Sequence, residues 1–183
     1  SHQEYLAARS SNFRYDLKRK YKRAEKMGTV SFEVLKDMPE QGIEQFASLY
    51  EKRWSSKDTN ATIRNETGQK LLNEAIRTWA ADGILRIPVM KINGTIVAFC
   101  LGFIKDARFY YYIPSFDPAF VQASPGKLLV EYILKSFPDL GIHEIDFMKG
   151  EERYKLEWSD TFRQNYRLLL WNKRPSSLLY AGT

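Results

Sequence analysis

Hydrophobic residues recur along the chain at two spacings, and each spacing predicts one kind of element. Between Glu4 and Met27, apolar residues recur at intervals of three or four, which is the pattern of one face of a helix. That set is Phe13, Leu17, Tyr21 and Ala24. Gly28 follows and is expected to end the helix. Residues 29–36 alternate apolar and polar side chains instead, which predicts a strand.

Two further helices are predicted before the middle of the chain. Pro39 opens the first, which runs to about Trp54. The second covers residues 66–82, where apolar side chains again follow helical spacing. The intervening residues 55–65 are polar and are predicted to form a loop of the kind that often borders a functional site.

A hairpin follows these helices. The pair Asn93-Gly94 lies between two apolar runs, residues 84–92 and 95–104. Both central positions of such a two-residue turn need a positive φ, which Asn and Gly tolerate. The sequence therefore predicts two antiparallel strands joined by a tight turn.

An aromatic strand is predicted next, after a tight turn at Asp106-Ala107. It runs from Arg108 to Ile113 and is rich in the aromatic and β-branched side chains that favour strands. Pro114 is expected to end it, because proline donates no hydrogen bond to a ladder.

The run Ser124-Pro125-Gly126-Lys127 predicts the start of a helix that extends to about Phe137. Ser124 is expected to cap the helix with its side chain, and Pro125 suits the first helical position because it has no N–H to leave unsatisfied. Two more strands are predicted after it, residues 142–148 and 161–171.

The resulting order is strand, two helices, three strands, helix, strand, a short segment and a last strand. A helix between two strands implies that these strands are parallel neighbours. The predicted fold class is therefore α/β (α+β), with one mixed, mostly antiparallel sheet and helices on both faces. The predicted organisation is a basic N-terminal helix, residues 1–27, followed by a single domain, residues 28–183.

Composition agrees with a folded domain. Of 183 residues, 44% are hydrophobic and 14% aromatic, which argues against disorder. Apolar runs such as residues 96–104 are too short to span a bilayer, and no signal peptide is evident, so we expect a cytoplasmic location. Cys100 has no cysteine to pair with, and two distant histidines suggest no metal site. Ser1-His2 resembles the remnant of a cleaved tag, so the chain is expected to be part of a longer one.

The net charge of +6 belongs to one segment. Residues 5–27 carry eight Lys or Arg and two acidic residues, which gives +6, and the rest of the chain carries twenty of each. The basic helix is therefore either a solvated face or a contact for an anionic membrane, a nucleic acid or a polyanionic substrate.

The helix start at Ser124 has an unusual second feature. Lys127 falls in the first helical turn, where the helix dipole disfavours cations. A lysine beside Gly126 fits an anion, because glycine lets a ligand approach the main chain and free amides at a helix start bind phosphate. An ordinary capped helix that binds nothing is the alternative.

This order of elements resembles the GNAT superfamily of acyl-CoA-dependent N-acyltransferases over residues 28–172. In that family the turn before the third helix holds the CoA diphosphate with backbone amides. The resemblance implies acetyl-CoA or another acyl-CoA as co-substrate and no metal. It assigns CoA binding to Tyr112 and Ile113 on the strand and to the turn. The turn residues are Gln122, Ala123, Ser124, Gly126, Lys127 and Leu128. Gln122 and Gly126 fit the family pattern Arg/Gln-x-x-Gly-x-Gly/Ala only loosely.

Several short motifs resemble one branch of the superfamily more closely, the CelD-like proteins associated with cellulose biosynthesis and the related FemAB-like transferases. Those motifs are Asn12-Phe13-Arg14 with Leu17, Arg53-Trp54, the aromatic strand, Ser124-Pro125-Gly126, and Asp146-Phe147 followed by Gly150 and Tyr154-Lys155. FemAB-like enzymes consist of two GNAT-like halves, which would fit a chain that is the C-terminal half of a longer protein.

Acyl transfer to an amine needs a polarised carbonyl, a base for the amine and an acid for the leaving thiolate. The resemblance implies that main-chain amides near Tyr112 and Ile113 polarise the carbonyl and that Tyr154 is the acid. Asp146 lies between apolar residues and is a candidate base, or else a structural partner for Lys155 or a backbone N–H. Glu144, Glu151 and Glu152 are alternative bases, whereas His143 is expected to face away.

Four residues are assigned to the acceptor side. Arg53 and Lys155 could bind an anionic group or form simple salt bridges. Trp54 could line the site, and Asp117 could line it or just make a turn. The expected function is transfer of an acetyl or acyl group to an amine of a small-molecule or cell-envelope acceptor. The alternatives are a FemAB-like aminoacyltransferase whose basic helix contacts the RNA of aminoacyl-tRNA, and a non-catalytic interaction module.

Overall fold

The computed structural model describes residues 1–38, 42–54, 66–166 and 168. The chain divides into two units, residues 1–148 and 149–183. The first unit contains the sheet and most of the helices, and the second contains one short helix, α7 (Arg153–Trp158). The predicted boundary after residue 27 stays a prediction.

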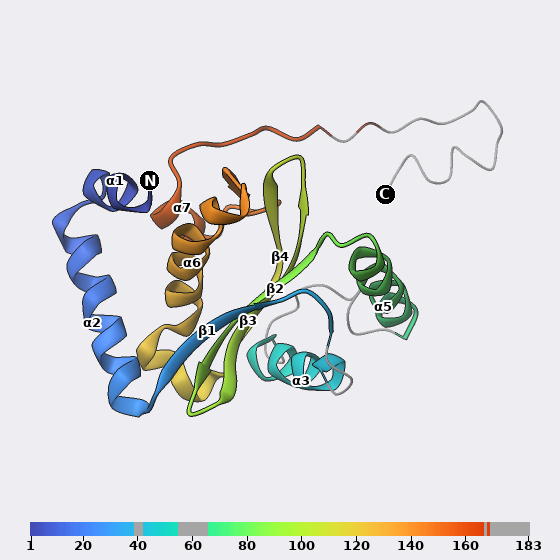
Figure 1. Cartoon of the computed structure of the whole chain (residues 1–183), viewed down its shortest axis with the longest axis horizontal. Coiled ribbons are helices and arrows are strands. Elements are labelled where there is room, and N and C mark those ends of the chain that lie inside the picture. The colour runs from blue at the N-terminus through green and yellow to red at the C-terminus, as the bar shows by residue number, and fades with distance from the viewer. Residues whose placement is uncertain (39–41, 55–65, 167, 169–183) are drawn as a thin grey trace, which may run out of the picture. The chain divides into compact units, whose positions relative to one another are not determined.

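The first unit is built on a five-stranded sheet whose strands lie side by side in chain order. The strands are β1 (Val30–Leu35), β2 (Leu85–Ile92), β3 (Thr95–Lys105), β4 (Arg108–Phe116) and β5 (Glu144–Asp146). The first four pair antiparallel, and β5 pairs parallel to β4 (Figure 1). The mixed, mostly antiparallel sheet predicted from the sequence is confirmed.

Helices cover both faces of this sheet, as predicted. α6 packs on one face against β2, β3 and β4, with α2 lying along it, whereas α3 and α5 contact β4 and β2 from the other side (Figure 1). The helices and 3-10 helices of the first unit are α1 (His2–Ala8), α2 (Ser11–Met27), α3 (Gly42–Trp54), α5 (Glu66–Ala81), η1 (Pro118–Ala123), α6 (Pro125–Ser136) and η2 (Pro138–Leu140). None of the helices among the described residues is both long and apolar enough to cross a bilayer.

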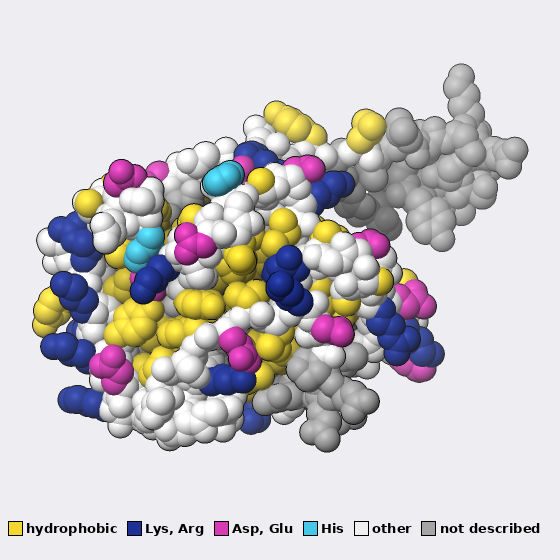
Figure 2. Space-filling view, in the orientation of Figure 1, with side chains coloured by type: hydrophobic (Ala, Val, Ile, Leu, Met, Phe, Trp, Pro, Cys, Tyr) yellow, Lys and Arg dark blue, Asp and Glu magenta, His cyan; other side chains and the backbone are white. Residues whose placement is uncertain are grey.

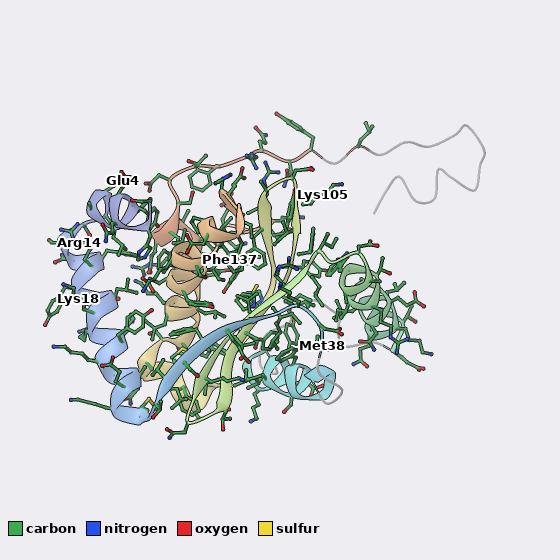
Figure 3. The ribbon with its side chains drawn as sticks, in the orientation of Figure 1. Glu4, Arg14, Lys18, Met38, Lys105 and Phe137 are labelled. Atoms are coloured by element: carbon green, nitrogen blue, oxygen red, sulfur yellow. The ribbon has the colours of Figure 1, made fainter. Side chains whose placement is uncertain are left out.

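The core lies against the two central strands. On the α3 and α5 side, the ring of Phe46 stacks on that of Phe99 with centroids 4.2 Å apart. On the α6 side, Phe137 at the end of the helix meets Phe109 of β4 edge to face at 4.8 Å, and Figure 3 shows Phe137 directed inward. Apolar burial on both faces explains why β2 and β3 read as nearly continuous hydrophobic runs.

The two tight turns form as the sequence predicts. Asn93 and Gly94 have φ angles of 51° and 79°, and Asp106 and Ala107 have 53° and 55°. These left-handed pairs join β2 to β3 and β3 to β4 with the twist that antiparallel strands need.

The predicted helix from Glu4 to Met27 is wrong in one respect, because it is two helices. The Ser10 side chain accepts a hydrogen bond from the Phe13 amide at 3.2 Å and caps a new helix there. Serine is a common N-cap residue, but the spacing of apolar residues alone does not show that a second helix starts after Ser10.

The prediction that Pro114 ends the aromatic strand is also wrong. β4 continues to Phe116, and Pro114 pairs with Cys100 of β3. Beyond Tyr110, β4 has no described strand on its other side, so the N–H that proline lacks is not needed there.

The predicted strand over residues 142–148 is shorter than expected. β5 is only Glu144–Asp146, because an Asp146 carboxylate oxygen accepts the Met148 amide at 2.7 Å and Met148 turns with φ 60°. The last predicted strand is not formed by residues 161–166 or 168, and its other residues lie outside the described part. The predicted loop over 55–65 and the helix start at Pro39 also lie outside it.

Candidate active site

Strands β4 and β5 are paired over only three residue pairs and then diverge. The last pair is Tyr110 with Asp146, yet β4 continues for six more residues. The chain after Asp146 turns away through the Met148 hydrogen bond. Residues 111–116 of β4 therefore have no described strand paired on this side, and we call this unpaired edge the opening.

A β-bulge lies at the start of this opening. Leu101 of β3 pairs with Ile113, and its neighbour Gly102 pairs with Tyr111, so Tyr112 is the extra residue. A bulge redirects the main-chain groups of the bulged strand. Tyr112 and Ile113, predicted to supply the amide that polarises a carbonyl, are therefore the two residues whose backbone the bulge sets.

The buried thiol of Cys100 lies against this bulge. Burial raises the pKa of Cys100, and nearby amides of Tyr112 and Ile113 partly offset that rise. The Tyr112 and Ile113 amides thus lie close enough to this sulfur to favour its charged form, although sulfur is a weak hydrogen-bond acceptor.

β4 leads through η1 into α6, and the turn between them does not form the predicted cap. Ser124 is left-handed, with φ 50°, and makes no side-chain cap. Its hydroxyl instead lies 3.5 Å from the Val121 carbonyl and accepts from Lys20 at 2.8 Å. The expectation that Ser124 caps α6 is therefore wrong, because the hydroxyl oxygen accepts a hydrogen bond from Lys20 of α2 instead.

Most backbone amides of the turn already donate hydrogen bonds within the protein. The Lys127 and Leu128 amides donate to the Ser124 carbonyl at 2.9 and 3.3 Å, and the Ser124 amide donates to Val121. Pro125 has no N–H, which leaves Gly126 as the amide in positions 124–128 without a carbonyl acceptor among the described residues. The side chains of Ala123 and Leu128 are buried, so these predicted CoA contacts can act only through their backbone.

Gly126 has room that the fold does not use. A Cβ built on it would meet a single atom of Phe116 at 3.6 Å, an ordinary contact. Its φ is not among the positive values of this chain. Neither packing nor backbone strain therefore requires glycine here, whereas close approach of a ligand to the main chain would.

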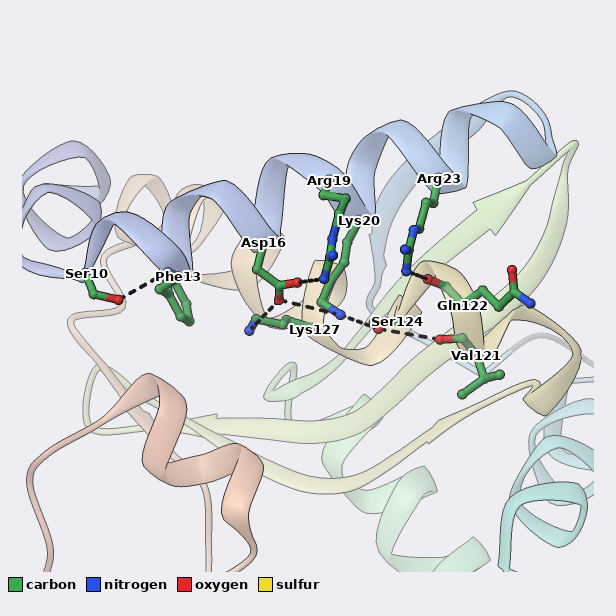
Figure 4. Close-up of polar contacts among 10 residues, drawn as sticks. All are labelled: Ser10, Phe13, Asp16, Arg19, Lys20, Arg23, Val121, Gln122, Ser124 and Lys127. Carbon is green, nitrogen blue, oxygen red and sulfur yellow. Dashed lines mark hydrogen bonds and ion pairs between the residues drawn. The ribbon is translucent and has the colours of Figure 1, made fainter.

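The basic helix lies directly over this turn (Figure 4). Lys20 reaches Ser124, and an Arg23 guanidinium nitrogen donates to the Gln122 carbonyl at 3.4 Å. Lys127 points back to Asp16 of α2, with its ammonium 3.2 Å from a carboxylate oxygen. The two helices thus exchange charged side chains across the start of α6.

Asp16 is the carboxylate at the centre of these contacts. Burial raises its pKa, but hydrogen bonds from Arg19 and Lys127 and the charges of Lys20 and Lys127 outweigh burial and hold the pKa below its usual value. Asp16 is therefore ionised at neutral pH. It supplies the anion that a lysine in the first turn of a helix requires.

Two other carboxylates near the opening have structural partners. Asp146 accepts the Met148 amide, which is the backbone alternative considered from the sequence, and its use as a general base stays a prediction. Glu144 forms an ion pair with Arg108 at 2.9 Å, which disfavours it as a base. His143 is exposed, and its amide donates a hydrogen bond to the Ala107 carbonyl at 2.9 Å.

The second unit holds the predicted acid and one predicted substrate contact. Tyr154 lies in α7, and its catalytic role stays a prediction. Lys155 forms an ion pair with Glu152 at 2.6 Å and donates to the Lys149 carbonyl at 2.9 Å. Burial raises the pKa of Glu152, but the hydrogen bond from Lys155, a backbone hydrogen bond and the charge of Lys155 together outweigh burial and hold the pKa below its usual value. Lys155 thus has the salt bridge named as its alternative role.

The remaining predicted substrate residues are only partly placed. Arg53 and Trp54 end α3, and their side chains lie outside the described part of the chain. Asp117 caps η1 by accepting the Ala119 amide at 3.0 Å and pairs with Lys52 at 3.4 Å. Asp117 thus makes a turn, the second of its two predicted roles.

Sequence reasoning missed the part that α2 plays at this turn. Lys20 and Arg23 were predicted only as part of the basic helix, and Asp16 was not singled out. Lys20 is 104 positions from Ser124 in the chain, and no local pattern reports so distant a contact. The unusual Lys127 was the available signal, because it required an anion nearby. Among the described residues there is no group of three or more metal-ligating side chains.

Comparison with known proteins agrees with this geometry. The family model described as Acetyltransferase (GNAT) domain matches residues 11–156. FemX shares the fold with a TM-score of 0.61 at 13% identity, over 85% of this chain and 54% of FemX. No curated protein matches the chain by sequence.

Two further solved structures are similar in fold. A predicted acetyltransferase with acetyl-CoA from Clostridium acetobutylicum has a TM-score of 0.55 at 11% identity, over 79% of this chain and 96% of that one. An aminoglycoside acetyltransferase from an uncultured soil metagenomic sample, in complex with sisomicin, has a TM-score of 0.50 at 14% identity, over 79% and 97%. The family match spans more than half of the chain, from α2 to α7. This chain therefore belongs to the GNAT acetyltransferase family and is an acyltransferase of that type.

Proposed function

We propose that this protein transfers an acyl group from acyl-CoA to an amine, with the diphosphate of CoA bound at the turn from η1 into α6. The observation that carries the proposal is Gly126. It leaves open space at a helix start beside an uncommitted amide, and the fold makes no use of that space. Helix starts of this kind bind phosphate through amides and the helix dipole.

We place the acyl group beside the bulge, at the edge of β4 where β5 is no longer paired with it. In the proposed reaction the amine nitrogen attacks the thioester carbonyl carbon, a C–N bond forms and the C–S bond breaks. A bulge amide from Tyr112 or Ile113 stabilises the negative oxygen that develops. Asp146 would take the amine proton, and Tyr154 would protonate the departing thiolate.

The acceptor is proposed to be an amine on a small molecule or a cell-envelope intermediate. The similar aminoglycoside acetyltransferase, solved with sisomicin, supports an amine of this size as the acceptor class. A relation to the CelD-like branch would favour a cell-envelope acceptor.

Replacement of Gly126 by alanine tests the proposal. Alanine fits the fold and favours helix, so the free energy of unfolding should stay equal or rise by up to about 1 kcal/mol. The added methyl should still hinder a diphosphate at the main chain and weaken CoA binding about tenfold. Urea unfolding and calorimetric titration with CoA measure the two effects. CoA binding by Gly126→Ala equal to wild type would contradict the proposed site.

An aminoacyl-tRNA donor is the other candidate, suggested by the basic helix and the FemAB-like resemblance. RNA would have to contact the outward cations of α2, of which Lys18, Lys22 and Lys26 are exposed. Figure 2 shows Lys and Arg side chains gathered along this edge, and Figure 3 shows Lys18 directed away from α6. The inward cations point instead to the α6 turn, which favours a compact phosphate ligand over an extended one.

A further inference from the structure

We infer that helix α2, which precedes the first strand, supplies part of the phosphate-binding site, with Lys20 and Arg23 binding phosphate groups of acyl-CoA alongside the α6 turn. The inference rests on the proposed function, because it concerns the same turn. It adds to that turn a second element that comes from outside the β4–α6 segment.

The first support is where the cationic side chains of α2 and α6 are held. The side chains of Lys20 and Lys127 are only 16% and 14% exposed, so their stems are packed and their ammonium groups fixed. The Lys20 ammonium is 2.8 Å from the Ser124 hydroxyl. The Lys127 ammonium lies 4.5 Å from the centre of the Phe13 ring, a contact that also orders it.

The second support is the imbalance of charge. Arg19, Lys20 and Lys127 all pair with one carboxylate, Asp16, and Arg23 lies further along α2 against the Gln122 carbonyl (Figure 4). A second carboxylate, Glu131, lies one helical turn after Lys127 and contacts Tyr21 of α2. The charges of these six side chains sum to +2, next to the positive end of the α6 dipole. Such an excess is unfavourable by itself and is offset when an anionic ligand binds.

The third support is the kind of partner that the cations have. If α2 were held only by ion pairs, its cations would be expected to face carboxylates. Lys20 has a hydroxyl as its nearer partner, with Asp16 at 3.5 Å, and Arg23 has a backbone carbonyl. Neutral oxygens satisfy the donors but not the charge, so both side chains have charge available for a phosphate.

Calorimetric titration with CoA tests the inference on four variants of the whole chain. Lys20→Gln and Arg23→Gln remove a charge at the turn, whereas Lys18→Gln and Lys22→Gln remove the same charge from the exposed side of the same helix. Glutamine at position 20 can still donate to the Ser124 hydroxyl, so its fold should persist. We expect about a tenfold rise in Kd for Lys20→Gln, a several-fold rise for Arg23→Gln, and less than a twofold rise for the two controls.

The outcomes separate this inference from the proposed function. A wild-type chain that binds no CoA would overturn the proposed function. A wild-type chain that binds CoA, with all four variants weakened equally or not at all, would overturn only the role of α2. If Lys20→Gln lowers the Tm, Lys20→Arg decides the question. If Lys20→Arg restores CoA affinity, position 20 contacts the phosphate through its charge. If Lys20→Arg restores the Tm but not the CoA affinity, that contact is refuted.

Discussion

Glu131 of α6 is a buried carboxylate, 6% exposed, held by two residues from the N-terminal helices. The Tyr21 hydroxyl donates to one oxygen at 2.5 Å, and His2 lies 2.8 Å from the other. Burial raises the pKa of Tyr21, as do the hydrogen bond to Glu131 and its charge, so the phenol remains a donor. Removal of that donor would leave a buried oxygen without its shortest contact.

Tyr21→Phe should therefore destabilise the protein by about 2 kcal/mol, which is typical of a lost hydrogen bond to a buried charged group. Tyr15→Phe is the matched control on the same helix, because Tyr15 is 70% exposed and its loss should cost less than about 0.5 kcal/mol. Urea unfolding of both variants measures the difference. Equal effects would show that Tyr21 does not secure α2 to α6.

At the scale of elements, the bulge in β4 depends on one glycine in β3. A Cβ on Gly102 would lie 2.4 Å from the Phe109 ring and 2.4 Å from the Tyr110 carbonyl oxygen. Phe109 is fully buried and packs on Phe137, so it cannot move aside easily. The close crossing of β3 and β4 therefore needs glycine where the pairing register shifts.

Gly102→Ala should thus lower the free energy of unfolding by about 1–3 kcal/mol, as overpacking of a core does. It should also weaken CoA binding, because the strands that shift carry Tyr112 and Ile113. Gly126→Ala is the same chemical change at a site with room, and its stability should not fall. Urea unfolding and CoA titration compare the two variants. A Gly102→Ala protein with wild-type stability would mean that the bulge tolerates a side chain.

The elements that could be predicted are those fixed by neighbours in sequence. Asn93-Gly94 defines a hairpin locally, and helical spacing with Pro125 defines α6. Those that could not be predicted depend on contacts between distant residues. The bulge requires Gly102 to meet Phe109, and Ser124 loses its cap to Lys20, which no local pattern reports. The length of β5 was missed because one carboxylate, Asp146, captures an amide two residues later.

At the scale of the first unit, Cys100 reports on the stability of the whole sheet. It lies in β3, between β2 and β4, and is fully buried. Burial raises its pKa, which suppresses the reactive thiolate. Phe99 faces α3, so Cys100 lies on the α6 face of the sheet, and a reagent can reach its sulfur only when that face is uncovered, which we expect to approach global unfolding.

Modification of Cys100 by Ellman's reagent should therefore be slow in the native protein and accelerate with urea in step with unfolding. The destabilised variant Tyr21→Phe should react faster, by about tenfold for each 1.4 kcal/mol of stability that it loses. A control chain with Cys100→Ala and Lys22→Cys should react quickly at all urea concentrations, since position 22 is exposed. A rate for Cys100 that does not change with urea would indicate local access to the sulfur.

The position of α2 ahead of the sheet separates two tasks in the polypeptide. In the inferred CoA site, contacts to the acyl donor would come partly from a segment that ends before β1 begins, while the bulge and the diverging strands belong to the sheet. A chimera in which another helix replaces α2 should then have a changed affinity for acyl-CoA, while the sheet that carries the bulge stays intact. Evolution could vary this protein's demand for its acyl carrier by exchanging about one helix, without rebuilding the domain behind it.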